Sequence, residues 1–70
     1  MIITVEYIKA KVEVIRAMAH DPEAAHSLED ALYKEVLTGI ITGSVEIGSV
    51  VAIADAALDA QDIKFNRWCA

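Results

Sequence analysis

Apolar residues recur at the three- and four-residue spacing of an α-helix over most of the chain, most clearly between Asp21 and Gly43. The stripe in this stretch consists of Ala25, Leu28, Ala31, Leu32, Val36 and Gly39. Asp21 is a favoured N-cap, Pro22 is a favoured first helical residue, and Gly43 suits the left-handed position after a helix. The pattern predicts a helix over 22–42, unless its first residues form a separate turn and the helix starts at Ser27.

The preceding segment predicts a helix over 5–19 that is apolar on more than one side. Thr4 is the expected N-cap, and Glu6 falls in the first turn, where the helix dipole favours an acid. One apolar stripe comprises Val5, Ile8, Val12, Ile15 and Ala19, and a second comprises Tyr7, Ala10, Val14, Ala17 and Met18. A strand over 2–8 is the competing interpretation, because Ile, Val, Thr and Tyr favour sheets. We prefer the helix, because the sequence offers no second strand candidate to pair with it.

A third helix is predicted over 45–59, with Ser44 as its cap and Glu46 in its first turn. Its apolar stripe is Ile47, Val51, Ala54 and Leu58. The many alanines of this segment allow it to approach a neighbouring helix closely. A later start at Gly48–Ser49 is the alternative.

The last segment, 62–69, contains the Phe and the Trp of the chain. Asp62 can cap a short helix there, and the apolar anchors of the segment are Ile63, Phe65 and Trp68. Each of the two aromatic side chains can bury about 150–250 Å². We expect a short helix or clasp that packs across the other helices, either in cis or on another chain. The predicted fold is therefore all-α: one domain over 1–70, a small three-helix bundle with a C-terminal clasp.

The composition indicates a contact surface. A chain of 70 residues removes only about 60% of its unfolded surface from water. Its apolar content is nevertheless 56% and its mean hydropathy is +0.41, whereas ordinary soluble domains are about 45–50% apolar. The apolar runs are far shorter than the roughly 20 residues that a bilayer requires, and the first residues lack the basic region of a signal peptide. We therefore expect a homo-oligomer, with a dimer favoured, and no membrane association.

The candidate interaction residues are apolar side chains that a single small core is not expected to cover. They are Tyr7, Val14, Met18, Tyr33, Leu37, Ile41, Phe65 and Trp68. Tyr and Met are enriched in protein interfaces. The leading hypothesis is a non-enzymatic protein–protein interaction protein that binds an unidentified host protein or a second copy of itself.

The net charge of −5 argues against direct nucleic-acid binding, because the six basic residues are scattered and form no basic patch. It supports a second hypothesis, an acidic decoy that inhibits a nucleic-acid-binding protein. The negative surface of such a decoy would consist of Asp21, Glu23, Glu29, Asp30, Asp55, Asp59 and Asp62.

A third hypothesis is a metal-binding helical protein. Glu23 and His26 have the Glu-x-x-His spacing of di-metal helix bundles, and Glu29 extends the series. This spacing is common on solvated acidic helices, so we predict no metal and no cofactor. Cys69 is the one cysteine, which rules out an internal disulfide and favours a reduced, cytoplasmic protein. Since no nucleophile elbow or phosphate-binding glycine loop is present, we also predict no enzymatic activity.

Glu35 falls inside the apolar stripe of the middle helix. The simpler interpretation is a carboxylate at the margin of the stripe that reaches solvent or a basic side chain. The alternative is an interface carboxylate that meets Arg16 or Arg67.

Two stretches, His26–Leu37 (HSLEDALYKEVL) and Asp62–Ala70 (DIKFNRWCA), resemble short orphan proteins of unknown function from actinobacteria and their phages. The chain departs from that pattern at Asn66, where Pro or Ala is expected, and in 42–49, which lacks an Asp-Pro helix start. The resemblance implies a small cytoplasmic protein, of phage or prophage origin, with an accessory or host-modulating role. It implies no functional residues.

Overall fold

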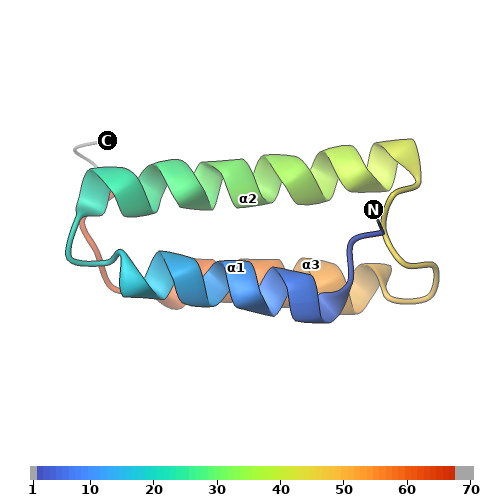
Figure 1. The fold of residues 1–70 in the computed structure, drawn as a ribbon, viewed down its shortest axis with the longest axis horizontal. Coiled ribbons are helices and arrows are strands. Elements are labelled where there is room, and N and C mark those ends of the chain that lie inside the picture. The colour runs from blue at the N-terminus through green and yellow to red at the C-terminus, as the bar shows by residue number, and fades with distance from the viewer. Residues whose placement is uncertain (1, 68–70) are drawn as a thin grey trace.

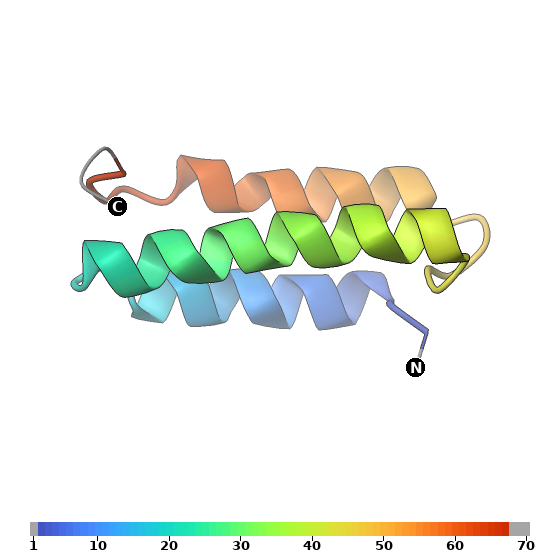
Figure 2. The ribbon, with the colours of Figure 1, turned by 90° about the horizontal axis from the view of Figure 1, so that it is seen from above.

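The computed structural model describes residues 2–67. Within this range the chain forms three α-helices, α1 (Val5–Ala17), α2 (Pro22–Thr42) and α3 (Val50–Leu58), and one 3-10 helix, η1 (Asp59–Asp62). Helices α1 and α3 share one layer and α2 packs over both, with the chain direction alternating from each α-helix to the next (Figures 1 and 2). The prediction of a small all-α three-helix bundle is confirmed.

The caps of α1 and α2 form as the sequence predicts. The Thr4 hydroxyl accepts a hydrogen bond from the backbone N–H of Tyr7 at 3.2 Å. The Asp21 carboxylate accepts one from the backbone N–H of Ala24, also at 3.2 Å. Helix α1 ends at Ala17, earlier than predicted, because the chain turns there to reach the cap of α2.

Helix α2 ends at the predicted glycine in a left-handed turn. Gly43 has φ of 73°, a conformation that a glycine adopts without steric cost. The N–H of Ser44 donates to the carbonyl of Gly39 at 2.7 Å, and the N–H of Gly43 donates to the carbonyl of Ile40 at 3.4 Å. This pair of bonds satisfies the last carbonyls of α2 and directs the chain back toward the N-terminal segment.

The predicted start of the third helix is wrong, because α3 begins at Val50, which agrees with the later of the two starts considered. The residues before it form an isolated parallel β-bridge between Ile3 and Val45. The N–H of Ile3 donates to the carbonyl of Ser44 at 2.7 Å, and the N–H of Glu46 donates to the carbonyl of Ile3 at 3.0 Å. The N-terminal segment therefore forms β structure at Ile3 alone. Its partner, Val45, belongs to the segment that was predicted as helix.

The β-bridge packs against α2 at Gly39. A Cβ atom on Gly39 would lie 2.8 Å from Ile3 Cδ1 and 3.2 Å from Val45 Cγ1, so the bare helix backbone makes room for both side chains. Ile3 and Val45 are themselves buried. Ile47, predicted for the apolar stripe of the third helix, lies in the connection instead and is 97% exposed.

The core draws on all the helices and on both ends of the described chain. Its buried apolar residues are Ile3, Ile8, Val12, Ile15, Ala25, Leu32, Val36, Val45, Ile53, Ala56, Ala57, Ala60 and Ile63. Helix α2 turns Glu29 into this core and leaves Leu28 and Ala31 exposed. The predicted stripe is wrong at Leu28 and Ala31. Glu29, which lay outside that stripe, is buried because Arg67, distant in the sequence, binds its carboxylate.

Candidate interaction surface

An apolar groove runs between α2 and α3. Its volume is about 400 Å³, and its lining residues are Tyr33, Val36 and Leu37 of α2 with Ala54, Ala57 and Leu58 of α3. The hydroxyl of Tyr33 is the one polar side-chain group among these residues. The alanines leave the floor of the groove low, whereas Leu37 and Leu58 form its raised edges, with 62% and 51% of their surface exposed.

The apolar character continues along both helices beyond the groove. Ile41 lies one turn after Leu37 on α2, and Val51 lies two turns before Leu58 on α3; both are 83% exposed. Helices α2 and α3 run in opposite directions side by side (Figure 2). Because Ile41 is near the end of α2 and Val51 is near the start of α3, both lie toward the same end of the bundle. We define the α2–α3 apolar surface as Leu37, Ile40, Ile41, Val50, Val51, Ala54 and Leu58.

A polar network lies beside the groove and holds the C-terminal segment. Among residues 2–67, Glu29 is the one charged side chain that is buried, at 3% exposure. Arg67 binds it with two hydrogen bonds, Nε to Oε1 at 2.9 Å and Nη2 to Oε2 at 3.2 Å, and also donates to the carbonyl of Ala60 at 3.0 Å. The Tyr33 hydroxyl donates to Glu29 Oε2 at 3.0 Å. Such a two-pronged, charge-assisted contact fixes both side chains in one geometry.

Tyr33 joins the network to the groove, because its ring lines the groove and its hydroxyl bonds to Glu29. Burial, followed by the hydrogen bond to the Glu29 carboxylate, raises the pKa of Tyr33 to about 12. The hydrogen bond to Glu29 likewise raises the pKa of Arg67. Tyr33 therefore remains a neutral donor, and Arg67 a charged one, at physiological pH.

The C-terminal clasp is present as an extended segment in cis over the described residues. Ile63 is buried, and Phe65 is half-buried against the core. The Arg67 guanidinium lies over the Phe65 ring at 3.9 Å from its centroid, a cation–π contact. The predicted short helix does not form over 63–67, because the helical turn comes earlier, in η1. Trp68 lies outside the described residues, as does the last part of the predicted clasp.

Tyr7 and Glu35 pair with each other between α1 and α2. The Tyr7 hydroxyl donates to Glu35 Oε2 at 2.7 Å, and this hydrogen bond raises the pKa of Tyr7. Lys11 Nζ lies 5.3 Å from the centroid of the Tyr7 ring. The expected basic partners of Glu35 bind other carboxylates, so Glu35 is a packing contact between helices rather than an interface charge.

The structure separates the remaining predicted interaction residues. Met18 is partly buried against the core. Val14 is 49% exposed and lines a small hollow between α1 and α2. Tyr33, Leu37 and Ile41 lie on the other side of α2, facing α3 or the solvent beside it. The sequence predicted Val51, Ala54 and Leu58 for the apolar stripe of the third helix, and this stripe is wrong as the packing face. Helix α3 turns Ile53, Ala56 and Ala57 into the core and leaves Val51 and Leu58 exposed beside α2.

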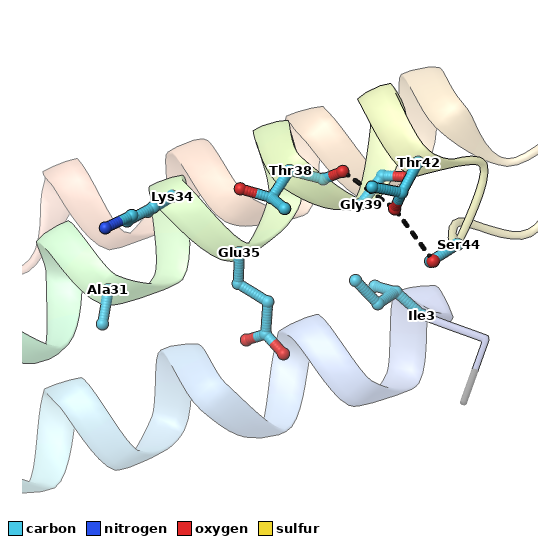
Figure 3. Close-up of a pocket in the computed structure, with 8 residues that line it drawn as sticks. All are labelled: Ile3, Ala31, Lys34, Glu35, Thr38, Gly39, Thr42 and Ser44. Atoms are coloured by element: carbon cyan, nitrogen blue, oxygen red, sulfur yellow. Dashed lines mark hydrogen bonds between the residues drawn. The ribbon is translucent and has the colours of Figure 1, made fainter.

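A second hollow, of about 440 Å³, lies between α2 and the N-terminal segment (Figure 3). The Thr42 hydroxyl donates to the carbonyl of Thr38 at 3.0 Å and lies 3.0 Å from the Ser44 hydroxyl oxygen. Glu35 points from α2 toward α1 in this view (Figure 3). Its carboxylate accepts the hydrogen bond from the Tyr7 hydroxyl. The hydrogen bonds of Thr42 thus stabilise the end of α2, and the hydrogen bond of Glu35 stabilises the contact between α1 and α2.

The residues of the metal hypothesis form no ligand cluster within 2–67, and one acid of the decoy hypothesis is buried. His26 Nε2 lies 3.5 Å from Asp30 Oδ1 in a helix-surface pair. Within residues 2–67, no group of three or more His, Cys, Asp or Glu side chains is placed to hold a metal ion. Glu29, one of the acids assigned to the decoy surface, is buried with Arg67.

Comparison of the chain with protein-family models, with curated proteins and with solved structures returns no significant match. Over the described residues, no helix combines the length and the apolar character needed to cross a membrane.

Proposed function

We propose that this chain is a non-enzymatic, cytoplasmic protein-interaction protein and that the α2–α3 apolar surface is its contact face. The observation that carries the proposal is a set of strongly exposed aliphatic side chains on two neighbouring helices: Leu37 and Leu58 edge one apolar groove, and Ile41 and Val51 lie beyond it on the same helices. Exposed apolar residues scattered singly are ordinary, whereas a contiguous patch rimmed by polar residues is typical of an interaction site.

The arrangement of the fold supports this assignment. The core is closed by the Ile3–Val45 bridge and by the docked segment 63–67, yet neither of these covers the α2–α3 apolar surface. The groove is apolar throughout its floor, which suits the desolvated centre of a protein interface. The resemblance of two segments to short proteins of actinobacteria and their phages supports an accessory or host-modulating role.

The experiment compares two charge insertions at exposed apolar helix positions. Leu37→Lys places a lysine in the α2–α3 apolar surface, and Val14→Lys places the same side chain on α1, outside it. Each purified chain is tested for self-association by sedimentation and for partner capture from a cell lysate. A substitution at a hot-spot residue near the centre of an interface weakens binding by about 30-fold or more, and Leu37 is the residue that we expect to act as one.

The proposal predicts a protein complex, with itself or with a captured protein, for the original chain and for Val14→Lys but not for Leu37→Lys. Circular dichroism must show equal helix content in all three chains. Equal loss of binding in Val14→Lys, or no complex in either assay, contradicts the proposal.

A further inference from the structure

The α2–α3 apolar surface has the shape of both a ridge and a groove. Leu37 and Ile41 stand one turn apart on α2 and form a ridge, which we call the α2 ridge. The neighbouring groove, floored by Val36, Ala54 and Ala57, has a volume of about 400 Å³. Side-chain ridges of one helix pack into grooves of another in most helix contacts. A surface that carries both elements side by side is complementary to itself.

We infer that the partner on this surface is a second copy of the chain, and that the α2 ridge of each copy occupies the α2–α3 groove of the other. The inference rests on the proposed function of this surface and names its partner. A two-fold axis parallel to the helices produces this arrangement. It places the α2 ridge of the first copy over the groove of the second, and the α2 ridge of the second copy over the groove of the first. The result is a closed dimer in which Leu37 of each copy sits over the alanine floor of its partner.

The available area matches what such a dimer needs. The exposed fractions of Leu37, Ile40, Ile41, Val50, Val51 and Leu58 are equivalent to about three and a half fully exposed aliphatic side chains. That is on the order of 500 Å² of apolar surface per copy. A standard interface buries roughly 800 Å² per partner, of which a little over half is non-polar, so the two apolar areas are similar. The surface therefore supplies the apolar part of an interface of standard size.

The charges at the margins also complement each other under this symmetry. Lys34 precedes Leu37 by one turn on α2 and also borders the hollow between α2 and the N-terminal segment, so it lies at the outer margin of the surface. Asp55 lies between Val51 and Leu58 on α3, and both charged residues are exposed. The two-fold axis exchanges the α2 and α3 margins, so Lys34 of one copy faces the margin that holds Asp55 of the other. Two chains of net charge −5 repel each other, and the absence of charged residues from the α2–α3 apolar surface keeps that repulsion outside the contact.

The first experiment is sedimentation equilibrium of the full chain between about 1 μM and about 500 μM, a range that covers micromolar dissociation constants. We expect a reversible dimer, with a dissociation constant raised at least about 30-fold by Leu37→Lys and by Ile41→Lys. Val14→Lys is the matched control and should leave the dissociation constant within about twofold of the original.

A charge exchange then tests the arrangement of the two copies. Lys34→Asp and Asp55→Lys alone should each weaken the dimer by about two- to fivefold, the effect of one rim pair. The double variant Lys34→Asp/Asp55→Lys should restore the original dissociation constant, and the single effects should fade at high salt.

A strict monomer up to the highest concentration overturns the inference, and so does a dimer that persists in both Leu37→Lys and Ile41→Lys. Additive losses in the charge-exchanged double variant overturn the two-fold arrangement. If the chain is monomeric but its capture of another protein still depends on Leu37, the homodimer is excluded and the proposed function of the surface is retained.

Discussion

Tyr33 links the polar network of the bundle to its apolar surface. Its ring forms one wall of the α2–α3 groove, and its hydroxyl is held by Glu29. Glu29 is held in turn by Arg67, so the position of a groove residue depends on the docking of the C-terminal segment. Because the Glu29 carboxylate is buried, it needs the hydrogen bonds from Arg67 and Tyr33 to replace those it would make with water.

Replacing Arg67 with alanine should lower the free energy of unfolding by about 1–3 kcal/mol, the cost of leaving a buried acceptor without its partner. Urea denaturation followed by circular dichroism measures this change. The matched control is Arg16→Ala, because Arg16 pairs with Glu13 on the solvent-exposed face of α1. That change should cost at most about 0.5 kcal/mol. Equal effects of the two substitutions would show that the C-terminal segment adds no stability through Glu29.

At the scale of the elements, α2 packs two different helices on its two edges. Glu35 faces α1 through Tyr7, whereas Tyr33 and Leu37 face α3. Near its C-terminal end, α2 contacts the Ile3–Val45 bridge at Gly39, which has no side chain. The long central helix is therefore in contact with both neighbouring helices and, through Ile3 and Arg67, with both ends of the described chain.

Gly39→Leu tests the packing of that bridge. Leucine is the better helix former by about 1 kcal/mol, but its side chain requires the space that Ile3 and Val45 occupy. We expect overpacking to dominate and to lower the free energy of unfolding by about 1–3 kcal/mol in urea denaturation. Thr38→Leu, at the exposed neighbouring position, should change it by no more than about 0.5 kcal/mol. A Gly39→Leu chain as stable as the original would contradict this account of the bridge.

The elements set by local chemistry are the ones that sequence could predict. The caps at Thr4 and Asp21 and the glycine end of α2 depend on residues within one turn, and all three are confirmed. The start of α3 depends on Ile3, more than 40 residues away, which pairs with Val45 and keeps that segment extended. Local periodicity contains no information about such a contact, so the helix was predicted to begin too early.

The same distinction applies to the candidate site. Tyr33, Leu37 and Ile41 could be recognised from the sequence as a second apolar face of the central helix, because their spacing is local. The burial of Glu29 could not, since its partner Arg67 is 38 residues away in the chain. Val51 and Leu58 were also recognised as part of an apolar stripe, but their exposure could not be predicted, because it depends on which face of α3 packs against the other helices.

At the scale of the whole molecule, the alanine-rich packing face of α3 accounts for the exposed aliphatic side chains of the α2–α3 apolar surface. Three buried alanines, Ala56, Ala57 and Ala60, bring α3 and η1 close to the core. The larger aliphatic residues Val51 and Leu58 are consequently left on the outer edge, beside the exposed Leu37 and Ile41 of α2. The described residues of a single copy complete the core without covering these side chains, and we propose that a second copy covers them.

Amide chemical shifts recorded during dilution test this central claim most directly. A ¹⁵N-labelled chain is diluted from about 1 mM to about 10 μM, a range that brackets micromolar dissociation constants. We predict concentration-dependent shifts concentrated in 37–41 and 50–58, with Val14 and its neighbours on α1 unchanged. Shifts centred on Val14, or spectra that do not change over this range, would contradict the assignment of the α2–α3 apolar surface as the contact between two copies of the chain.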